Sequence, residues 1–225
     1  LDPTLEARFR KELGVITFEG YGLTECSPVV ASNPSDARRR TGTVGLPMPG
    51  YDVQIRDEAE TPLPAGEEGV LWVRGPSVAS GYFRDPEQTA ERFRDGWFNT
   101  GDMVRIDEDG YIAILDRVSD MLVVSGFNVY PQEVETVIRE IPGVRETAVV
   151  GISNPVTGEV PVAFVIADES AGLTQSDIVG RCKSKLAHYK VPRKVRFVQE
   201  LPMSSVGKVL KRKLREMMGK ETKTP

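Results

Sequence analysis

The chain has 225 residues, 40% of them hydrophobic and 28% charged, which is typical of a soluble protein with one large or two small domains. Two cysteines are too few for a disulfide framework, and a single histidine, His188, excludes a multi-histidine metal site. No apolar run approaches the ~20 residues that a membrane-spanning helix needs, and no signal peptide is visible. We therefore expect a cytoplasmic protein and, because the chain opens on Leu1, a piece of a longer one.

Charge is divided unevenly along the chain. Residues 1–116 carry 12 basic and 21 acidic side chains, whereas residues 117–225 carry 17 basic and 12 acidic ones. Seven cations and two acids fall within residues 208–223. This basic segment suits a polyphosphate ligand or weak peripheral contact with an anionic membrane, and a solvated helix face explains it equally well. We expect no nucleic-acid partner.

The first half predicts a β-rich region after an initial helical stretch. Leu5, Phe9 and Leu13 repeat at helical spacing, which is typical of a helix packed against something. Short β-prone runs separated by turn signals follow, and residues 32–50, rich in proline and glycine, predict an exposed connection. The predicted strands are 15–18, 51–56, 70–74, 103–106 and 111–115.

After Asp116 the pattern changes to alternating strands and helices. Pro131 stands where a first-turn proline is tolerated, and apolar residues at helical spacing follow it as far as Ile141. Thr174 and Asp177 have the spacing of a capping box. The predicted strands are 121–125, 144–152, 160–167 and 195–198, and the predicted helices are 131–141, one beginning after Thr174, and 209–218.

The two patterns meet at residues 117–120, which contain neither proline nor glycine. We therefore predict a β-rich domain at 1–116 and a compact α+β domain at 117–225, connected by a short joint.

The first candidate ligand-binding motif is the segment 19–25. Gly20 and Gly22 allow close approach of the backbone, Tyr21 offers a flat ring, Thr24 a hydroxyl and Glu25 a carboxylate. A purine, a phosphate and a divalent cation need those three side-chain groups. A turn with a packed tyrosine and a solvated glutamate is the alternative.

The second candidate motif, residues 96–102, ends in Thr-Gly-Asp. Asp102, at the start of a strand, can accept two hydrogen bonds from neighbouring hydroxyls, as recognition of a ribose requires, although Gly-Asp turns are common. Further along, Gly126 stands beside Phe127, where a narrow ligand could pass or a strand could end.

The third candidate motif is the loop 202–208. Lys208 follows a glycine and can reach into a cleft, where its ammonium suits a phosphate or a developing carboxylate charge. The loop is not a Walker-type phosphate loop, because Pro202 and Val209 stand where that pattern needs glycine and Ser or Thr.

These motifs, taken in order with Gly81-Tyr82 and Asp116-Arg117 between them, resemble those of the adenylate-forming enzyme superfamily. The resemblance runs from Leu1 to Met218 and is most like the C-terminal part of long-chain fatty acid CoA ligases, chiefly because of residues 125–135. It implies the β-rich, distorted barrel-like end of the large domain, followed by a small α+β lid domain.

The resemblance also implies roles in binding ATP and Mg²⁺. Tyr21, between Gly20 and Gly22, would stack on adenine, and Thr24 would contact a phosphate. Glu25 would hold Mg²⁺. Asp102 would bind the ribose hydroxyls with help from Arg117.

In the lid, Lys208 would bridge the acid and the ATP phosphates. Ser119 would be the hinge, a position that is commonly Asp or Lys in relatives. Ser125 and Gly126 would line the path of the CoA thiol. The implied reaction converts acid and ATP to acyl-AMP and pyrophosphate, after which CoA displaces AMP.

The phosphate loop and the acyl-binding half of such an enzyme are absent from these residues, so we expect little ligase activity from the chain alone. Three alternatives stay open. They are an adenylation domain that loads a carrier protein, an aryl-acid ligase, and a non-catalytic nucleotide-binding or interaction remnant.

Overall fold

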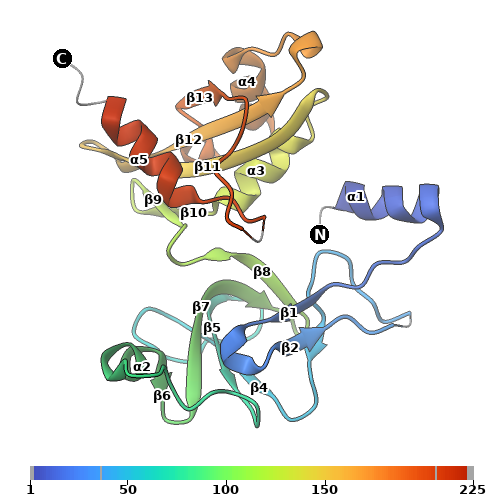
Figure 1. The fold of residues 1–225 in the computed structure, drawn as a ribbon, viewed down its shortest axis with the longest axis vertical. Helices are drawn as coiled ribbons and strands as arrows, with labels where there is room; N and C mark the ends of the chain where they lie inside the picture. The colour runs from blue at the N-terminus through green and yellow to red at the C-terminus, as the bar shows by residue number, and fades with distance from the viewer. Residues whose placement is uncertain (1–2, 36, 206, 222–225) are drawn as a thin grey trace. The chain divides into compact units, whose positions relative to one another are not determined.

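The computed structural model describes residues 3–35, 37–205 and 207–221, and the chain forms two compact units, Leu1–Val118 and Ser119–Pro225 (Figure 1). Strands dominate the first unit, and helices cover a sheet in the second. The predicted α+β class is confirmed. Among the described residues, no helix combines the length and the apolar character needed to cross a membrane.

The first unit opens with α1 (Pro3–Arg8), which continues as a π-helical turn, η1 (Phe9–Leu13). Gly14 ends the helix in a left-handed conformation with φ of +65°, and its N–H donates to the carbonyl of Arg10. The predicted helix is therefore present. However, Leu13 is 64% exposed, so this end of the stripe is not packed as expected.

Residues 15–18 do not form the predicted strand. The first strand, β1 (Gly20–Gly22), begins only after them. Val15, Ile16 and Phe18 are each about half exposed, and the described residues place no pairing strand beside them. Local β-propensity is insufficient here because a strand needs a partner for its backbone groups.

A small antiparallel sheet follows in the order β1-β2-β3, with β2 at Val29–Ser32 and β3 at Leu46–Pro47. A 3₁₀ turn, η2 (Thr24–Cys26), connects β1 to β2. Gly22 permits this tight connection because a Cβ at that position would lie 2.0 Å from the carbonyl oxygen of Pro28.

The larger antiparallel sheet of this unit has the order β4-β5-β7-β6, with β8 also paired to β7. Four predicted strands overlap β4, β5, β7 and β8; β4 and β8 begin one residue later than predicted, and β7 begins earlier, at Trp97. Leu71, Phe98 and Ile112 are fully buried in its core. The elements are β4 (Asp52–Arg56), β5 (Glu68–Arg74), α2 (Pro86–Arg92), β6 (Phe93–Arg94), β7 (Trp97–Ile106) and β8 (Ile112–Arg117).

The second unit is built on a mixed sheet of order β10-β9-β12-β11, and β13 pairs in parallel with β12. The strands are β9 (Leu122–Val124), β10 (Phe127–Val129), β11 (Val144–Asn154), β12 (Gly158–Ala167) and β13 (Lys194–Phe197). The helices are α3 (Pro131–Arg139), α4 (Gln175–Lys185) and α5 (Lys211–Glu221), with 3₁₀ turns η3 (Glu169–Ala171) and η4 (His188–Lys190). The predicted capping box is confirmed: Thr174 and Asp177 close it at the start of α4.

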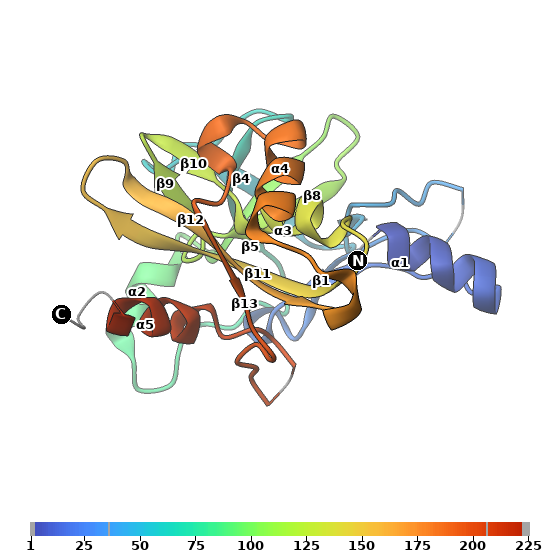
Figure 2. The same cartoon turned by 90° about the horizontal axis from the view of Figure 1, so that it is seen from above.

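Helices cover both faces of the β11–β12 hairpin in this unit (Figure 2). Successive strand residues point to opposite faces, so Val149 packs in a core with Ile138 of α3 and Ile178 of α4. Its neighbour Val150 packs in a second core with Leu214 of α5. The continuous apolar runs of the two strands follow from this burial on both sides.

Candidate active site

Three of the predicted site residues meet in the first unit. The hydroxyl of Tyr21 on β1 donates a short hydrogen bond to Oδ2 of Asp102 on β7. Arg117, at the end of β8, approaches the other carboxylate oxygen, with Nε 3.0 Å from Oδ1. The Asp102 side chain is only 4% exposed, whereas that of Arg117 is 55% exposed. A buried carboxylate thus carries a tyrosine on one oxygen and a half-exposed guanidinium on the other.

The turn that precedes Asp102 holds this carboxylate in place. Thr100 is buried; its hydroxyl donates to the Leu71 carbonyl at 2.8 Å and accepts the backbone N–H of Asp102 at 3.1 Å. Gly101 has a φ of +72°, and a Cβ there would lie 2.9 Å from the Arg92 guanidinium. The Thr-Gly-Asp sequence therefore forms a specific bend in β7.

Glu25 has a different partner. The hydroxyl of Tyr82 donates to Oε1 of Glu25 at 2.8 Å. The Tyr82 ring contacts Phe93 edge-on at 5.5 Å between centroids, which orients the phenol. Thr24, in the same turn as Glu25, is exposed.

Both phenols in this region are held in the neutral form. Burial, together with the negative charge of Asp102, raises the pKa of Tyr21 well above its usual range. Burial and the hydrogen bond to Glu25 raise the pKa of Tyr82. Each tyrosine therefore remains a hydrogen-bond donor to its carboxylate at neutral pH.

In the second unit, Lys208 stands at the end of a tight hairpin turn with its side chain exposed. The backbone N–H of Ser204 donates to the Lys208 carbonyl at 2.7 Å, and the Lys208 N–H donates to Oγ of Ser204 at 3.0 Å. Gly207 has a φ of +76°, as such a turn requires. Val206 lies outside the described residues.

Ser125 and Gly126 are the central residues of the β9–β10 hairpin. Both have positive φ, +52° and +84°, which is the signature of a type I′ turn. The Ser125 N–H donates to the Thr157 carbonyl at 2.8 Å. The glycine thus occupies an exposed hairpin tip, with Phe127 beside it stacked on Tyr189 at 4.6 Å.

Ser119 is exposed at the start of the second unit. Its carbonyl accepts a hydrogen bond from Arg215 of α5 at 3.4 Å, and the same guanidinium pairs with Asp120 at 2.9 Å. The predicted hinge segment is therefore connected to the last helix of its own unit.

Sequence reasoning assigned no role to Tyr82 or Thr100. Tyr82 was visible only as part of a Gly-Tyr pair, and its contact with Glu25 joins residues far apart in the chain. Thr100 lies in the motif 96–102, for which the sequence suggests a function only for Asp102. Their hydroxyls act by positioning carboxylates, which a local pattern does not reveal.

The described residues do not form a metal site made of protein side chains alone. Among the residues that the structure describes, no cluster of three or more His, Cys, Asp or Glu side chains could hold a metal ion. Mg²⁺ is commonly bound by one or two carboxylates together with substrate phosphates and water. The single carboxylate of Glu25 beside the exposed Thr24 fits that second mode.

Comparison with known proteins agrees with these features. Residues 1–83 match the family model "AMP-binding enzyme", and residues 133–208 match "AMP-binding enzyme C-terminal domain". A long-chain-fatty-acid–CoA ligase of Yersinia pestis is 48% identical over 198 residues, covering 88% of this chain and 35% of the ligase. A feruloyl-CoA synthase of Amycolatopsis is 38% identical, covering 92% of this chain and 42% of the synthase.

The crystal structure of ATP-bound MatB from Rhodopseudomonas palustris superimposes with a TM-score of 0.93 at 40% identity, covering 98% of this chain and 44% of MatB. The chain thus spans about a third to less than half of the length of the proteins it matches. Consecutive family models, high identity to ligases and a matching fold lead to one conclusion: the chain belongs to the AMP-binding, adenylate-forming enzymes, and corresponds to their C-terminal part.

Proposed function

We propose that these residues are the C-terminal part of an AMP-forming ligase that activates a fatty acid with ATP and transfers the acyl group to CoA. The observation that carries the proposal is the buried Asp102 carboxylate, with Tyr21 and Arg117 on its two oxygens, in a chain 48% identical to a fatty-acid–CoA ligase.

The Asp102 cluster suits a ribose. An ionised carboxylate offers about four acceptor positions, and Tyr21 and Arg117 each occupy one. The remaining positions would accept the two ribose hydroxyls. The Tyr21 ring, held by its own hydroxyl, would present a flat face to adenine.

Glu25 and Thr24 would face the phosphates. The Glu25 carboxylate, oriented by Tyr82, would hold Mg²⁺ together with phosphate oxygens. When bound, Mg²⁺ neutralises charge on the phosphates. The exposed hydroxyl of Thr24 would donate to a phosphate oxygen.

Lys208 would supply the positive charge for adenylation. Two hydrogen bonds with Ser204 hold the Lys208 backbone in a short turn, from which its exposed side chain can extend. There it would contact the attacking carboxylate and stabilise the charge that builds up as pyrophosphate leaves.

The second half-reaction would use another surface of the same unit. The exposed Ser125-Gly126 tip has no side chain at its second position and would line the path of the CoA thiol. Rotation about Ser119 would exchange this tip for Lys208, because two half-reactions at one centre need different groups beside the substrate. We accordingly propose lid and hinge roles for residues 117–225 and 117–120.

A fatty acid is favoured over an aromatic one by the comparisons. The fatty-acid–CoA ligase of Yersinia pestis is 48% identical to the chain and the feruloyl-CoA synthase of Amycolatopsis 38%. An aryl acid is therefore the competing substrate class to include in any assay.

The test is acid-dependent ATP–pyrophosphate exchange by the complete gene product that contains these residues. Exchange with palmitate but not with ferulate is expected, followed by palmitoyl-CoA formation when CoA is added. Asp102→Asn should raise the KM for ATP, and Lys208→Ala should abolish most exchange. Activity with ferulate alone would overturn the substrate class. Equal exchange by Lys208→Ala and the parent would overturn the role of Lys208.

A second assay concerns the 225 residues alone. We expect them to show no measurable palmitoyl-CoA formation, since they span only 35% of the length of the fatty-acid–CoA ligase that they match. Robust turnover by this chain would contradict the proposal that it is only the C-terminal part of the ligase.

A further inference from the structure

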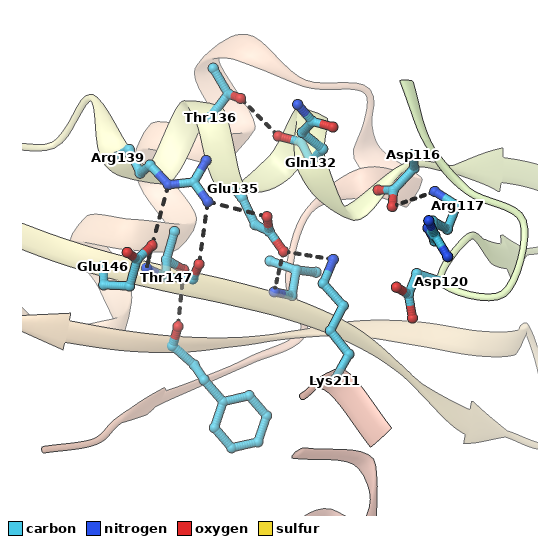
Figure 3. Close-up of polar contacts among 12 residues, drawn as sticks. Asp116, Arg117, Asp120, Gln132, Glu135, Thr136, Arg139, Glu146, Thr147 and Lys211 are labelled. Atoms are coloured by element: carbon cyan, nitrogen blue, oxygen red, sulfur yellow. Dashed lines mark hydrogen bonds and ion pairs between the residues drawn. The ribbon is translucent and has the colours of Figure 1, made fainter. Parts of the chain in front are cut away.

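Glu135 of α3 is a buried carboxylate at which three elements of the second unit meet (Figure 3). Its Oε1 accepts the backbone N–H of Val149 on β11 at 2.9 Å and lies 3.0 Å from Nζ of Lys211 on α5. Its Oε2 pairs with Arg139 at 3.3 Å. The side chains of Glu135 and Lys211 are 8% and 14% exposed, so this ion pair is largely withdrawn from water.

Lys211 is unfavourably placed for the helix that carries it. It is the first residue of α5, whose first turn contains basic residues and no acidic one. The N-terminus of a helix carries partial positive charge, so a cation there costs helix stability. The buried carboxylate of Glu135 offsets that cost, and it fixes the point at which α5 begins.

The start of α5 is also the outgoing leg of the turn that carries Lys208. The Leu210 N–H donates to the Pro202 carbonyl at 2.7 Å, and Met203 and Val209 form a bridge across the turn. Only Val209 and Leu210 separate Lys208 from Lys211. A shift in the start of α5 would therefore move the base of this turn directly.

From this geometry we infer that Lys211, anchored on Glu135, is a positioning residue that sets the location of Lys208 for adenylation. The inference rests on the proposed function, because it requires that Lys208 act in adenylation. Lys211 itself need not touch any substrate. The ion pair between Lys211 and Glu135 connects the turn that carries Lys208 to the core formed by α3 and β11.

A purely structural ion pair makes a different prediction. If the pair only stabilised the second unit, its loss would lower both half-reactions together and in proportion to the loss of folded protein. If it positions Lys208, adenylation alone should fall, because thioester formation from a preformed acyl-adenylate does not use Lys208. A displacement of about 1 Å at a reacting group can cost on the order of a hundredfold in rate.

The test compares Lys211→Met with Lys213→Met in the complete gene product. Lys213 is an exposed lysine two residues further along the same helix, so it controls for loss of one charge. For Lys211→Met we expect ATP–pyrophosphate exchange to fall by roughly tenfold to a hundredfold in kcat, with little change in the KM for ATP. Palmitoyl-CoA formation from supplied palmitoyl-adenylate should change less than twofold, and Lys213→Met should match the parent in both assays.

A double variant separates positioning from the penalty of a buried carboxylate that keeps Arg139 but has lost the ammonium of Lys211. Lys211→Met with Glu135→Gln removes both members of the pair, so it should recover thermal stability that Lys211→Met loses. ATP–pyrophosphate exchange should stay low in the double variant. The single variant Lys211→Arg, which keeps the positive charge, should retain part of the parent's exchange activity. Recovery of exchange together with stability, or equal loss in both half-reactions, would overturn the inference.

Failure of the inference and failure of the proposed function are distinguishable. If Lys208→Ala suppresses exchange and a folded Lys211→Met variant does not, only the positioning role is wrong. If Lys208→Ala itself leaves exchange intact, the role of Lys208 is wrong and the positioning role falls with it.

Discussion

Arg215 of α5 holds two neighbouring groups at the start of the second unit, the carboxylate of Asp120 at 2.9 Å and the carbonyl of Ser119 at 3.4 Å. Both partners of the ion pair are partly buried, with side-chain exposures of 33% and 24%. The residue proposed as a hinge is therefore restrained from within its own unit. Because the Ser119 side chain has no charge to pair with, the contact with Arg215 is made through the Ser119 backbone carbonyl.

Arg215→Leu should free this segment. We expect faster amide hydrogen exchange at residues 119–121 and a stability loss of about 1 kcal/mol or less, since a partly exposed pair contributes little. Arg212→Leu is the matched control, because Arg212 is 87% exposed and pairs within the helix with Glu216 at 3.5 Å. Unchanged exchange at 119–121 in Arg215→Leu would show that the contact does not restrain the hinge.

Tyr21→Phe should destabilise the first unit in a pH-dependent way. The variant removes a hydrogen bond to a buried carboxylate, which typically contributes about 1.5 to 3 kcal/mol. Because the pKa of Tyr21 is raised in the folded state, the phenol's contribution is complete below the unfolded pKa of about 10 and declines as pH rises beyond it. Denaturant unfolding at neutral and alkaline pH, compared between the two proteins, measures this difference, which should shrink above pH ~10.

Two glycine-to-alanine substitutions should have opposite effects. At Gly22, the new Cβ would lie 2.0 Å from the Pro28 carbonyl, so the β1–β2 connection must shift, at a cost of about 1 to 3 kcal/mol. At Gly180 in α4, a Cβ meets nothing within 4 Å, so alanine should stabilise the helix by about 0.5 to 1 kcal/mol. Thermal unfolding of both variants provides the check, and a neutral Gly22→Ala would contradict the close approach seen here.

The two cysteines should resist thiol reagents in the folded protein. Cys26 and Cys182 are fully buried, and burial raises the pKa of each thiol to about 11. The reactive thiolate is therefore scarce, and the reagent cannot reach it. Mass spectrometry after treatment with iodoacetamide at pH 8 should show labelling only when denaturant is added. Rapid labelling of either cysteine in the native protein would mean that the core around it opens readily.

Local patterns in the sequence predicted much of the second unit. The helix that begins at Pro131, the turn that joins β11 to β12 and the capping box of Thr174 and Asp177 all depend on residues within a few positions of each other. Hydrophobic periodicity and capping chemistry are visible in the sequence because the residues that produce them are close together in the chain. The order of motifs along the chain likewise sufficed to identify the family.

Only the tertiary structure decided which side chains meet. Tyr21 contacts Asp102, which is 81 positions away in the chain. Glu135 pairs with Lys211, and nothing in the local sequence distinguishes this lysine from the others in the basic C-terminal segment. Residues 15–18 have the composition of a strand yet remain unpaired in the described structure. Pairing of strands and choice of ion-pair partner depend on which surfaces folding brings together, and a period of two or 3.6 residues carries no information about that.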